Sequence, residues 1–208
     1  TAHNLSENYL ALSKTDSAQH YLKLAKAYLN ETHHFASYHH RVQAKLEQKM
    51  NNYELALKEL NFALHLEKEK WKNAKNESIA IIYNEIGMLQ AAFGQYVSAV
   101  ANYNLGLEQV EDFDSKGTST LKLLKNKSIS LNKLGNNDNY KATMETVNLG
   151  IKTLDTLKPS FRSKADQLFL IEDAFPLFES GLEAAYQLYA STSDDSLIDL
   201  AFRYSEKS

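Results

Sequence analysis

The stretch AIIYNEIGMLQAAFGQYVSAVANYNLGLEQ, residues 80–109, places glycines inside a segment that otherwise has the composition of helix. A glycine inside a helix costs about 1 kcal/mol relative to alanine, so Gly87 and Gly106 need a compensating contact. Close approach of two helices supplies one, because a larger side chain would keep them apart. The spacing predicts two helices joined by a tight turn at Gly94, with Gly87 facing Ala99 within the pair and Gly106 meeting the next pair.

Small residues recur along the chain at related intervals. Ala25, Ala63, Gly106 and Gly150 follow one another after 38, 43 and 44 residues. Internal similarity at such a period is typical of solenoid proteins, in which each repeat packs against its neighbours. We therefore expect a series of helical hairpins with the small residues at their contacts.

This pattern resembles the tetratricopeptide repeat (TPR). That motif has an aromatic residue, Leu-Gly, a turn glycine, an aromatic, alanine, an aromatic and alanine, and the residues here are Tyr83, Ile86, Gly87, Gly94, Tyr96, Ala99, Tyr103 and Gly106. The chain departs from the motif at Gln90, where an aromatic residue is usual, and in a period longer than the ~34 residues of the family. The resemblance implies an all-α, right-handed α–α superhelix of about four to five helical hairpins.

The whole chain fits one helical repeat domain. It contains 208 residues with 2 prolines and 7 glycines, and 43% of the residues are apolar, which favours helix throughout. Pro176 is expected to kink or break its helix near Ala174. A three-helix bundle could imitate one repeat but not four in register. The expected units are residues 1–30, 33–68, 78–113, 119–157 and 160–208.

Composition excludes several classes of function. The net charge of −3 gives no general attraction to nucleic acid, and no apolar run reaches the ~20 residues of a membrane span. The absence of cysteine excludes disulfides, thiolate metal sites and a cysteine nucleophile from this chain. Because the sequence starts at Thr1 and stops within a helical pattern, we expect a fragment of a longer polypeptide. A cytoplasmic location is favoured, and the trimmed start leaves export open.

Residues 178–208, FESGLEAAYQLYASTSDDSLIDLAFRYSEKS, have a more specific resemblance. They are similar to the last repeat before the catalytic domain in bacterial caspase-like peptidases of the TPR-associated (CHAT-domain) type. The resemblance implies that a peptidase domain follows residue 208. Its His/Cys dyad has no counterpart here, since the chain has no cysteine and no histidine after His65. We therefore expect this chain to be non-catalytic.

Histidines are concentrated near the N-terminus, at His20, His33, His34, His39 and His40. Zinc sites usually combine two ligands one helical turn apart with further converging ligands. The segment HHFASYHH lacks that spacing, so we expect a polar helix surface with no bound metal or other cofactor. Adventitious metal binding and a metal-dependent enzyme are the alternatives.

The first helix of each TPR hairpin lines an inner groove, and the resemblance therefore implies candidate ligand-binding residues. Lysine and arginine supply positive charge, and asparagine both donates and accepts hydrogen bonds, which suits an acidic peptide or a carboxylate. A solvated helix face is the alternative, and a shift of one residue in phase would remove Arg41. The candidates are Arg41, Lys45, Ile81, Asn84, Met88, Ala91, Ala92, Lys122, Lys125, Asn126, Ile129, Asn132 and Lys133.

The groove resembles the carboxylate clamp of chaperone-binding repeats only in part. Glu85 stands where that clamp has asparagine, so binding of a chaperone tail is disfavoured. The sequence predicts a scaffold or regulatory module that binds a protein or peptide and precedes a caspase-like peptidase effector. The alternative is the sensor or ligand-binding repeat region of a bacterial signalling protein, either a histidine kinase or a transcription regulator. Self-association through the last helix is also expected, without a nucleic-acid partner.

Overall fold

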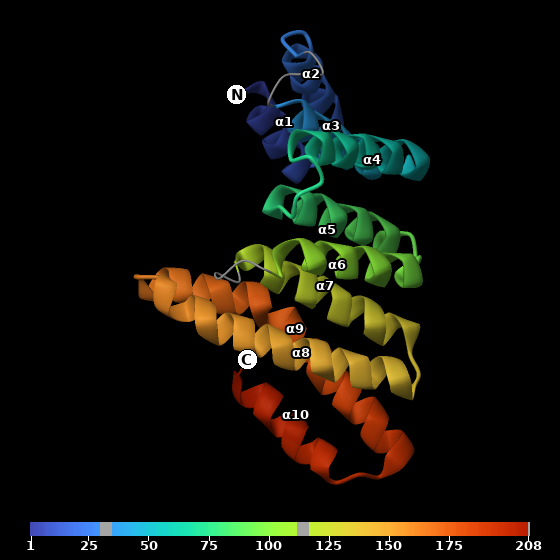
Figure 1. Cartoon of the computed structure of the whole chain (residues 1–208), viewed down its shortest axis with the longest axis vertical. Coiled ribbons are helices and arrows are strands. Elements are labelled where there is room, and N and C mark those ends of the chain that lie inside the picture. Colours follow the sequence, from blue (N-terminus) through green and yellow to red (C-terminus); the bar gives the residue numbers. More distant parts are fainter. Residues whose placement is uncertain (30–34, 112–116, 208) are drawn as a thin grey trace.

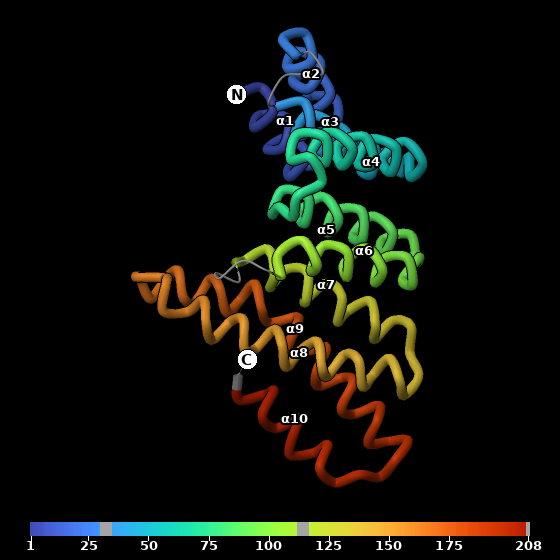
Figure 2. Tube along the Cα trace, in the orientation of Figure 1, coloured from blue at the N-terminus to red at the C-terminus, as the bar shows by residue number. Residues whose placement is uncertain are grey.

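The computed structural model describes residues 1–29, 35–111 and 117–207, and the regular elements among them are all helical (Figures 1 and 2). The prediction of an all-α chain is confirmed for these residues. The elements are α1 (Ala2–Ala11), α2 (Thr15–Lys26), α3 (Ala36–Lys49), α4 (Tyr53–Lys70), α5 (Glu77–Ala92), α6 (Tyr96–Val110), α7 (Thr118–Leu134), α8 (Asn137–Leu157), a short 3-10 helix (Lys158–Ser160), α9 (Lys164–Thr192) and α10 (Ser196–Lys207).

Consecutive helices pack in pairs, and the pairs stack. The pairs are α1–α2, α3–α4, α5–α6, α7–α8 and α9–α10. The second helix of each pair also packs against the first helix of the next, at α2–α3, α4–α5, α6–α7 and α8–α9. Figure 1 shows the result as an elongated stack, with α4 to α8 in successive layers along the longest axis. Contacts between helices adjacent in sequence thus build the whole fold.

A backbone conformation with positive φ joins the two helices of every pair. It occurs at Ser13 (56°), Asn51 (60°), Gly94 (76°), Gly135 (67°), Asn136 (64°) and Ser193 (54°). In three of these turns the following N–H donates to the carbonyl five residues earlier, with N–O distances of 2.8 to 2.9 Å, as in a Schellman motif; the bonds are Lys14 to Tyr9, Asn52 to Glu47 and Gln95 to Gln90. Because only two of the residues with positive φ are glycine, the recurrence of the turn is hidden in the sequence.

Two interior glycines admit a leucine from the following pair. A Cβ atom added at Gly106 would lie 2.7 Å from Cδ2 of Leu123 on α7. One added at Gly150 would lie 2.4 Å from Cδ2 of Leu177 on α9. These distances are shorter than any normal contact, so the leucines occupy the space that a side chain would need.

Two other glycines admit a tyrosine from the second helix of their own pair. An added Cβ at Gly87 would lie 2.4 Å from Cε1 of Tyr103, and one at Gly181 would lie 2.8 Å from Cδ2 of Tyr204. Both tyrosines are only 1% exposed. The sequence did not single out Gly181, although it has the same role in α9–α10 as Gly87 has in α5–α6.

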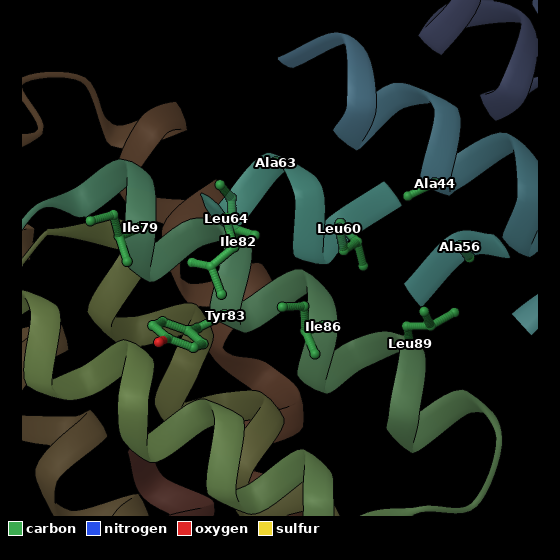
Figure 3. Close-up of a cluster of buried hydrophobic side chains, with 10 residues drawn as sticks. All are labelled: Ala44, Ala56, Leu60, Ala63, Leu64, Ile79, Ile82, Tyr83, Ile86 and Leu89. Atoms are coloured by element: carbon green, nitrogen blue, oxygen red, sulfur yellow. The ribbon is translucent and has the colours of Figure 1, made fainter. Parts of the chain in front are cut away.

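The alanines of the repeat pattern are also interior. Ala25, Ala63 and Ala99 are buried. Figure 3 shows the cluster around Ala63, where Leu60 and Leu64 of α4 pack with Ile82 of α5. Burial of such side chains contributes about 1.5–3 kcal/mol each, so the apolar contacts between successive helices account for most of the stabilisation.

Pro176 lies inside α9, which continues from Lys164 to Thr192. A break near Ala174 is therefore not found, and Figure 1 shows instead a helix that bends along its length. Ala174, Leu177 and Phe178 are all fully buried. Their packing against neighbouring helices holds the segment helical, although proline removes one backbone hydrogen bond.

Candidate functional site

A groove opens between the first helices of two neighbouring pairs, where these two helices lie apart. Such helices pack closely at α1–α3, α5–α7 and α7–α9, but the backbones of α3 and α5, both described in full, approach each other much less. The space between them forms a groove of about 570 Å³ that extends to α7. Ala44 and Leu60 contribute apolar surface at its base, together with Ile81 and Leu89 of α5.

Most of the residues proposed from the sequence line this groove. They are Arg41, Lys45, Ile81, Asn84, Met88, Lys122, Lys125 and Asn126. Asn132 and Lys133 lie outside the lining, because the last turn of α7 runs past the groove toward α9. Asn132 is buried there, and its Nδ2 donates to the Ser180 carbonyl at 2.8 Å. Ala91, Ala92 and Ile129 are also absent from the lining.

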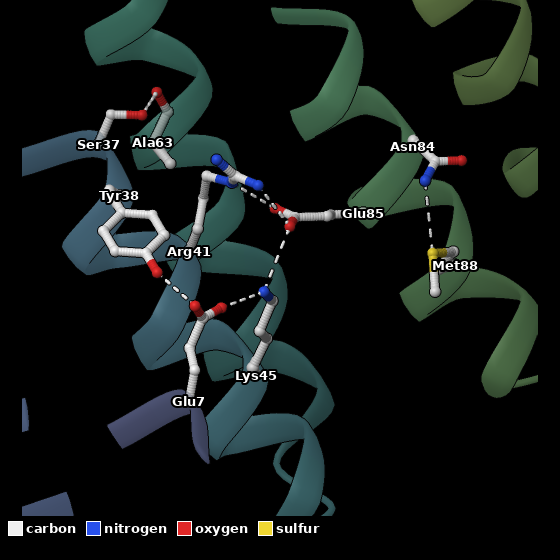
Figure 4. A network of polar contacts seen from close by, with 9 residues as sticks. All are labelled: Glu7, Ser37, Tyr38, Arg41, Lys45, Ala63, Asn84, Glu85 and Met88. Atoms are coloured by element: carbon white, nitrogen blue, oxygen red, sulfur yellow. Dashed lines mark hydrogen bonds and ion pairs between the residues drawn. The ribbon is translucent and has the colours of Figure 1, made fainter. Parts of the chain in front are cut away.

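Ion pairs between side chains bridge the gap between α3 and α5. Nε and one terminal nitrogen of Arg41 donate to the two carboxylate oxygens of Glu85 at 2.7 and 2.8 Å (Figure 4). Lys45 Nζ lies 2.5 Å from Glu7 of α1 and 3.7 Å from Glu85. The Tyr38 hydroxyl donates to the second oxygen of Glu7. These groups form one network that joins α1, α3 and α5.

The network fixes the charge states of its members. Burial alone would raise the pKa of Glu7, but hydrogen bonds from Lys45 and Tyr38 outweigh it and lower that pKa. Burial would likewise lower the pKa of Arg41, and the Glu85 carboxylate raises it. Burial and the bond to Glu7 raise the pKa of Tyr38 to about 12. The carboxylate of Glu7 and the guanidinium of Arg41 therefore stay charged at neutral pH.

The opposite wall of the groove combines amides with lysines. Asn126 donates to Asn84 Oδ1 at 2.9 Å, and this pair connects α7 to α5. Lys125 Nζ lies 2.6 Å from Asp173 Oδ1 and also donates to the Asp173 carbonyl at 3.0 Å. Lys122 is exposed and forms no ion pair within the part of the chain that the structure describes. The groove thus contains four cations, of which Lys122 alone faces solvent without a carboxylate from the described residues.

Sequence reasoning missed the carboxylates that pair with these cations. Glu7 and Asp173 lie 38 and 48 residues from their lysine partners, and no local pattern relates them. Glu85 was recognised as unlike the clamp residue of chaperone-binding repeats. Its charge, next to the expected cation Arg41, was a usable signal for the pair.

The histidines do not share one environment. His39 is 5% exposed, and its Nδ1 lies 3.1 Å from Nε2 of His3, so a polar helix surface was the wrong expectation for this residue. His40 Nδ1 lies 2.5 Å from Glu59. His20 is exposed, and its ring meets that of Tyr21 edge-on. His33 and His34 lie outside the described residues.

Neither a metal-binding cluster nor a membrane-spanning helix is found in the part of the chain that the structure describes. No group of three or more histidine, cysteine, aspartate or glutamate side chains is arranged to hold a metal ion there. None of the described helices is both long and apolar enough to cross a bilayer. The last helix does expose Ile198 (49%) and Phe202 (69%), and self-association through this face stays a prediction.

Comparison with solved structures identifies the architecture. The nearly identical TPR-like repeats of a candidate kinesin light chain from Podosopora anserina superpose with a TM-score of 0.67 at 13% identity, over 99% of this chain and 94% of that one. The fold is a TPR-like solenoid. BtubC (BKLC) from P. vanneervenii gives a TM-score of 0.66 at 13% identity, over 97% of this chain and 77% of that one. The predicted superhelix of four to five helical hairpins is confirmed. No protein-family model and no curated protein matches the sequence.

Proposed function

We propose that this chain is a non-catalytic module that binds a peptide segment of a partner protein in the groove between α3, α5 and α7. The observation that carries the proposal is the groove itself, which has an apolar base and polar walls from three successive pairs of helices. Concave sites of this kind bind through apolar surface and are made specific by a few polar groups. A solenoid can hold an extended segment across several repeats.

The polar groups favour a peptide that carries at least one acidic side chain. Lys122 offers a charge that no described carboxylate neutralises, and the Asn84–Asn126 pair retains capacity for further hydrogen bonds. Met88, which is 48% exposed, offers an adaptable apolar contact between them. We therefore place an apolar residue of the ligand near Met88 and a carboxylate near Lys122.

The residues of the groove support binding rather than catalysis. Among the described residues the lining contains no histidine, and the chain has no cysteine. Ser119, the one hydroxyl of that described lining, donates to Glu77 at 2.7 Å. A nucleophile needs an adjacent base with a third group to orient it, and the groove lining offers no such triad.

A caspase-like peptidase is the effector that we propose for this module. Support comes from the resemblance of residues 178–208, which form the end of α9 and α10, to the repeat before that domain. The alternative effectors are a histidine kinase and a transcription regulator. The coding sequence after residue 208 decides among them, because a His…Cys pair in an α/β pattern supports the peptidase and a kinase or DNA-binding region contradicts it.

Matched charge reversals on one helix test the binding proposal. Fluorescence polarisation with arrays of labelled acidic, neutral and basic peptides should select acidic ones. Lys122→Glu should weaken their binding about tenfold, because an attractive contact becomes repulsive. Lys133→Glu makes the same change outside the groove and should have little effect. Equal losses in the two variants, or preference for basic peptides, would contradict the proposed site.

A further inference from the structure

The contact between Arg41 and Glu85 has the geometry with which proteins hold the carboxylate of a ligand. A guanidinium presents its N–H groups as a planar fork that matches two carboxylate oxygens. Here two nitrogens of Arg41 bind one oxygen each of Glu85, at 2.7 and 2.8 Å. The Tyr38 ring, 5.9 Å from the Arg41 guanidinium carbon, helps to hold the arginine in this orientation.

The pair lies in the ligand groove and not in the packed interior. Arg41, Lys45 and Glu85 all line the groove. The side chains of Arg41 and Glu85 are 19% and 15% exposed, so a ligand in the groove can reach them. The pair also spans the separation between α3 and α5, whose backbones approach each other less than those of the other first helices. A carboxylate from another molecule could therefore enter at the same place.

We infer that Glu85 is an internal substitute for a ligand carboxylate, which closes a carboxylate-binding site formed by Arg41 and Lys45 in the free protein. This inference rests on the proposed peptide-binding function and names a second acidic position in the peptide, distinct from the one near Lys122. The ligand carboxylate takes the two hydrogen bonds of Arg41, and Glu85 turns away from it. Binding is thus an exchange of one carboxylate for another.

The contacts of Lys45 allow this exchange without leaving a charge unpaired. Lys45 Nζ is 3.7 Å from Glu85, a long contact that can shorten when Glu85 leaves Arg41. On its other side Lys45 is held by Glu7 at 2.5 Å. Glu85 therefore has a second cation available, so that neither its carboxylate nor that of the ligand lacks a cationic partner. Competition between Glu85 and the ligand carboxylate for Arg41 also makes the groove selective among acidic segments, because a weakly acidic segment does not displace Glu85.

Replacement of Glu85 by its uncharged isostere tests the inference. The probe is a fluorescein-labelled peptide of alternating leucine and glutamate, and its counterpart with glutamine in place of glutamate is the reference. Glu85→Gln should bind the glutamate peptide about tenfold more tightly than the unchanged protein, because the competing carboxylate is gone. Affinity for the glutamine peptide should not change. Glu54→Gln, an exposed position on α4 outside the groove, makes the same change in net charge and is the matched control.

Two further variants keep the test independent of how well Glu85→Gln folds. Glu7→Gln releases Lys45 from its other partner and should give a smaller gain, of about threefold. Addition of Arg41→Gln to Glu85→Gln should abolish the gain, since the receptor for the carboxylate is removed. Circular dichroism establishes that each variant is helical before affinities are compared.

The outcomes separate this inference from the proposed function. Selective gains with Glu85→Gln and Glu7→Gln support it. Equal binding of the glutamate peptide by the unchanged protein, Glu85→Gln and Glu54→Gln overturns the role of Glu85 and leaves the peptide groove standing. Failure of every helical variant to bind either peptide overturns the proposed function, and the inference with it.

Discussion

The joint between α3 and α5 and the joint between α7 and α9 connect equivalent helices in different ways. At α7–α9 the backbones pack directly with the Lys125–Asp173 ion pair beside them, and Gly150 on the adjoining α8 gives Leu177 the space to insert. At α3–α5 the backbones separate, and the Arg41–Glu85 pair spans the interval. The stack itself continues here through the apolar packing of α4 on α5. Polar side chains join only α3 to α5, and the groove opens there.

The same contrast extends to the ends of the chain. In the N-terminal region α1 contacts α3 through the buried His3–His39 pair and through Glu7 and Lys45. In the C-terminal region α10 packs on α9 through Tyr204, which inserts at Gly181. Both regions have an apolar core, but only in the first does a buried histidine pair join two helices beside that core. The two regions should therefore respond differently to pH.

Acid should weaken the N-terminal region first, with the largest effect that we predict. Burial lowers the pKa of His39 from 6.5 to about 4, and the charges of His3, His40 and Lys26 act in the same direction. The charge of Glu59 opposes them with a smaller effect. Between these values the unfolded chain binds a proton that the folded chain does not, so the free energy of unfolding falls as pH falls. Each pKa unit is worth about 1.4 kcal/mol, which gives a loss on the order of 3 kcal/mol by pH 4.

Hydrogen exchange at pH 7 and pH 4.5 measures this loss by region. Protection should fall in α1–α3 and persist in α7–α10. His39→Gln should flatten the pH dependence above about pH 4.5, and the remaining acid loss, from Glu7 and Glu59 with their lowered pKa values, should appear at lower pH. Uniform loss of protection along the chain would remove the distinction between the two regions.

Loss of one partner of the α3–α5 ion pair should cost about 2 kcal/mol. Arg41→Met leaves Glu85, which is largely buried, with only the 3.7 Å contact to Lys45, and an uncompensated buried charge is strongly destabilising. Urea denaturation should show the loss in the single variant. The double variant Arg41→Met, Glu85→Leu should regain most of it, because both charges are gone. If the double variant is as unstable as the single one, the pair is needed for packing at this joint.

Gly150→Ala should destabilise the C-terminal joint by about 1–2 kcal/mol. The added Cβ would lie 2.4 Å from Cδ2 of Leu177, and overpacking of this kind costs about 1–3 kcal/mol, less up to about 1 kcal/mol regained in helix propensity. Thermal unfolding should show the same loss at pH 7 and pH 5. The double variant Gly150→Ala, Leu177→Ala should lose less stability than the sum of the two single losses, because Leu177→Ala vacates that space. Additive effects would contradict the close approach.

The sequence predicted the apolar joints better than the polar ones. Gly106 and Gly150 were recognisable because glycine within a helical pattern requires a reason, and their spacing repeats. The Arg41–Glu85 pair joins residues 44 apart in sequence, and only the separation of α3 and α5 brings them together at a groove. Asn132 and Lys133 were misplaced because the helical pattern of α7 continues past the end of that groove. Tertiary spacing of this kind leaves no periodic signal.

The smallest predicted effect concerns the turns within the pairs. The turns of the first two pairs have Ser13 and Asn51 at positive φ, where the next two pairs have Gly94 and Gly135. Ser13 has a φ of 56° and Gly94 a φ of 76°, and a residue with a Cβ in this conformation loses about 1 kcal/mol. Ser13→Gly should therefore raise the free energy of unfolding by up to about 1 kcal/mol. Asn51→Gly should give about half as much, because asparagine tolerates this conformation better than serine does.

Gly94→Ala is the reverse experiment, and it isolates the backbone term. An added Cβ at Gly94 meets no atom within 4 Å, so its cost of about 1 kcal/mol comes from the conformation alone. Urea denaturation of the three variants should place Ser13→Gly and Gly94→Ala at similar magnitudes with opposite signs. A neutral or destabilising Ser13→Gly would mean that the added freedom of the unfolded chain outweighs the relief of strain. The turns of the two halves would then be equally good, and the difference between the halves would reside in their joints.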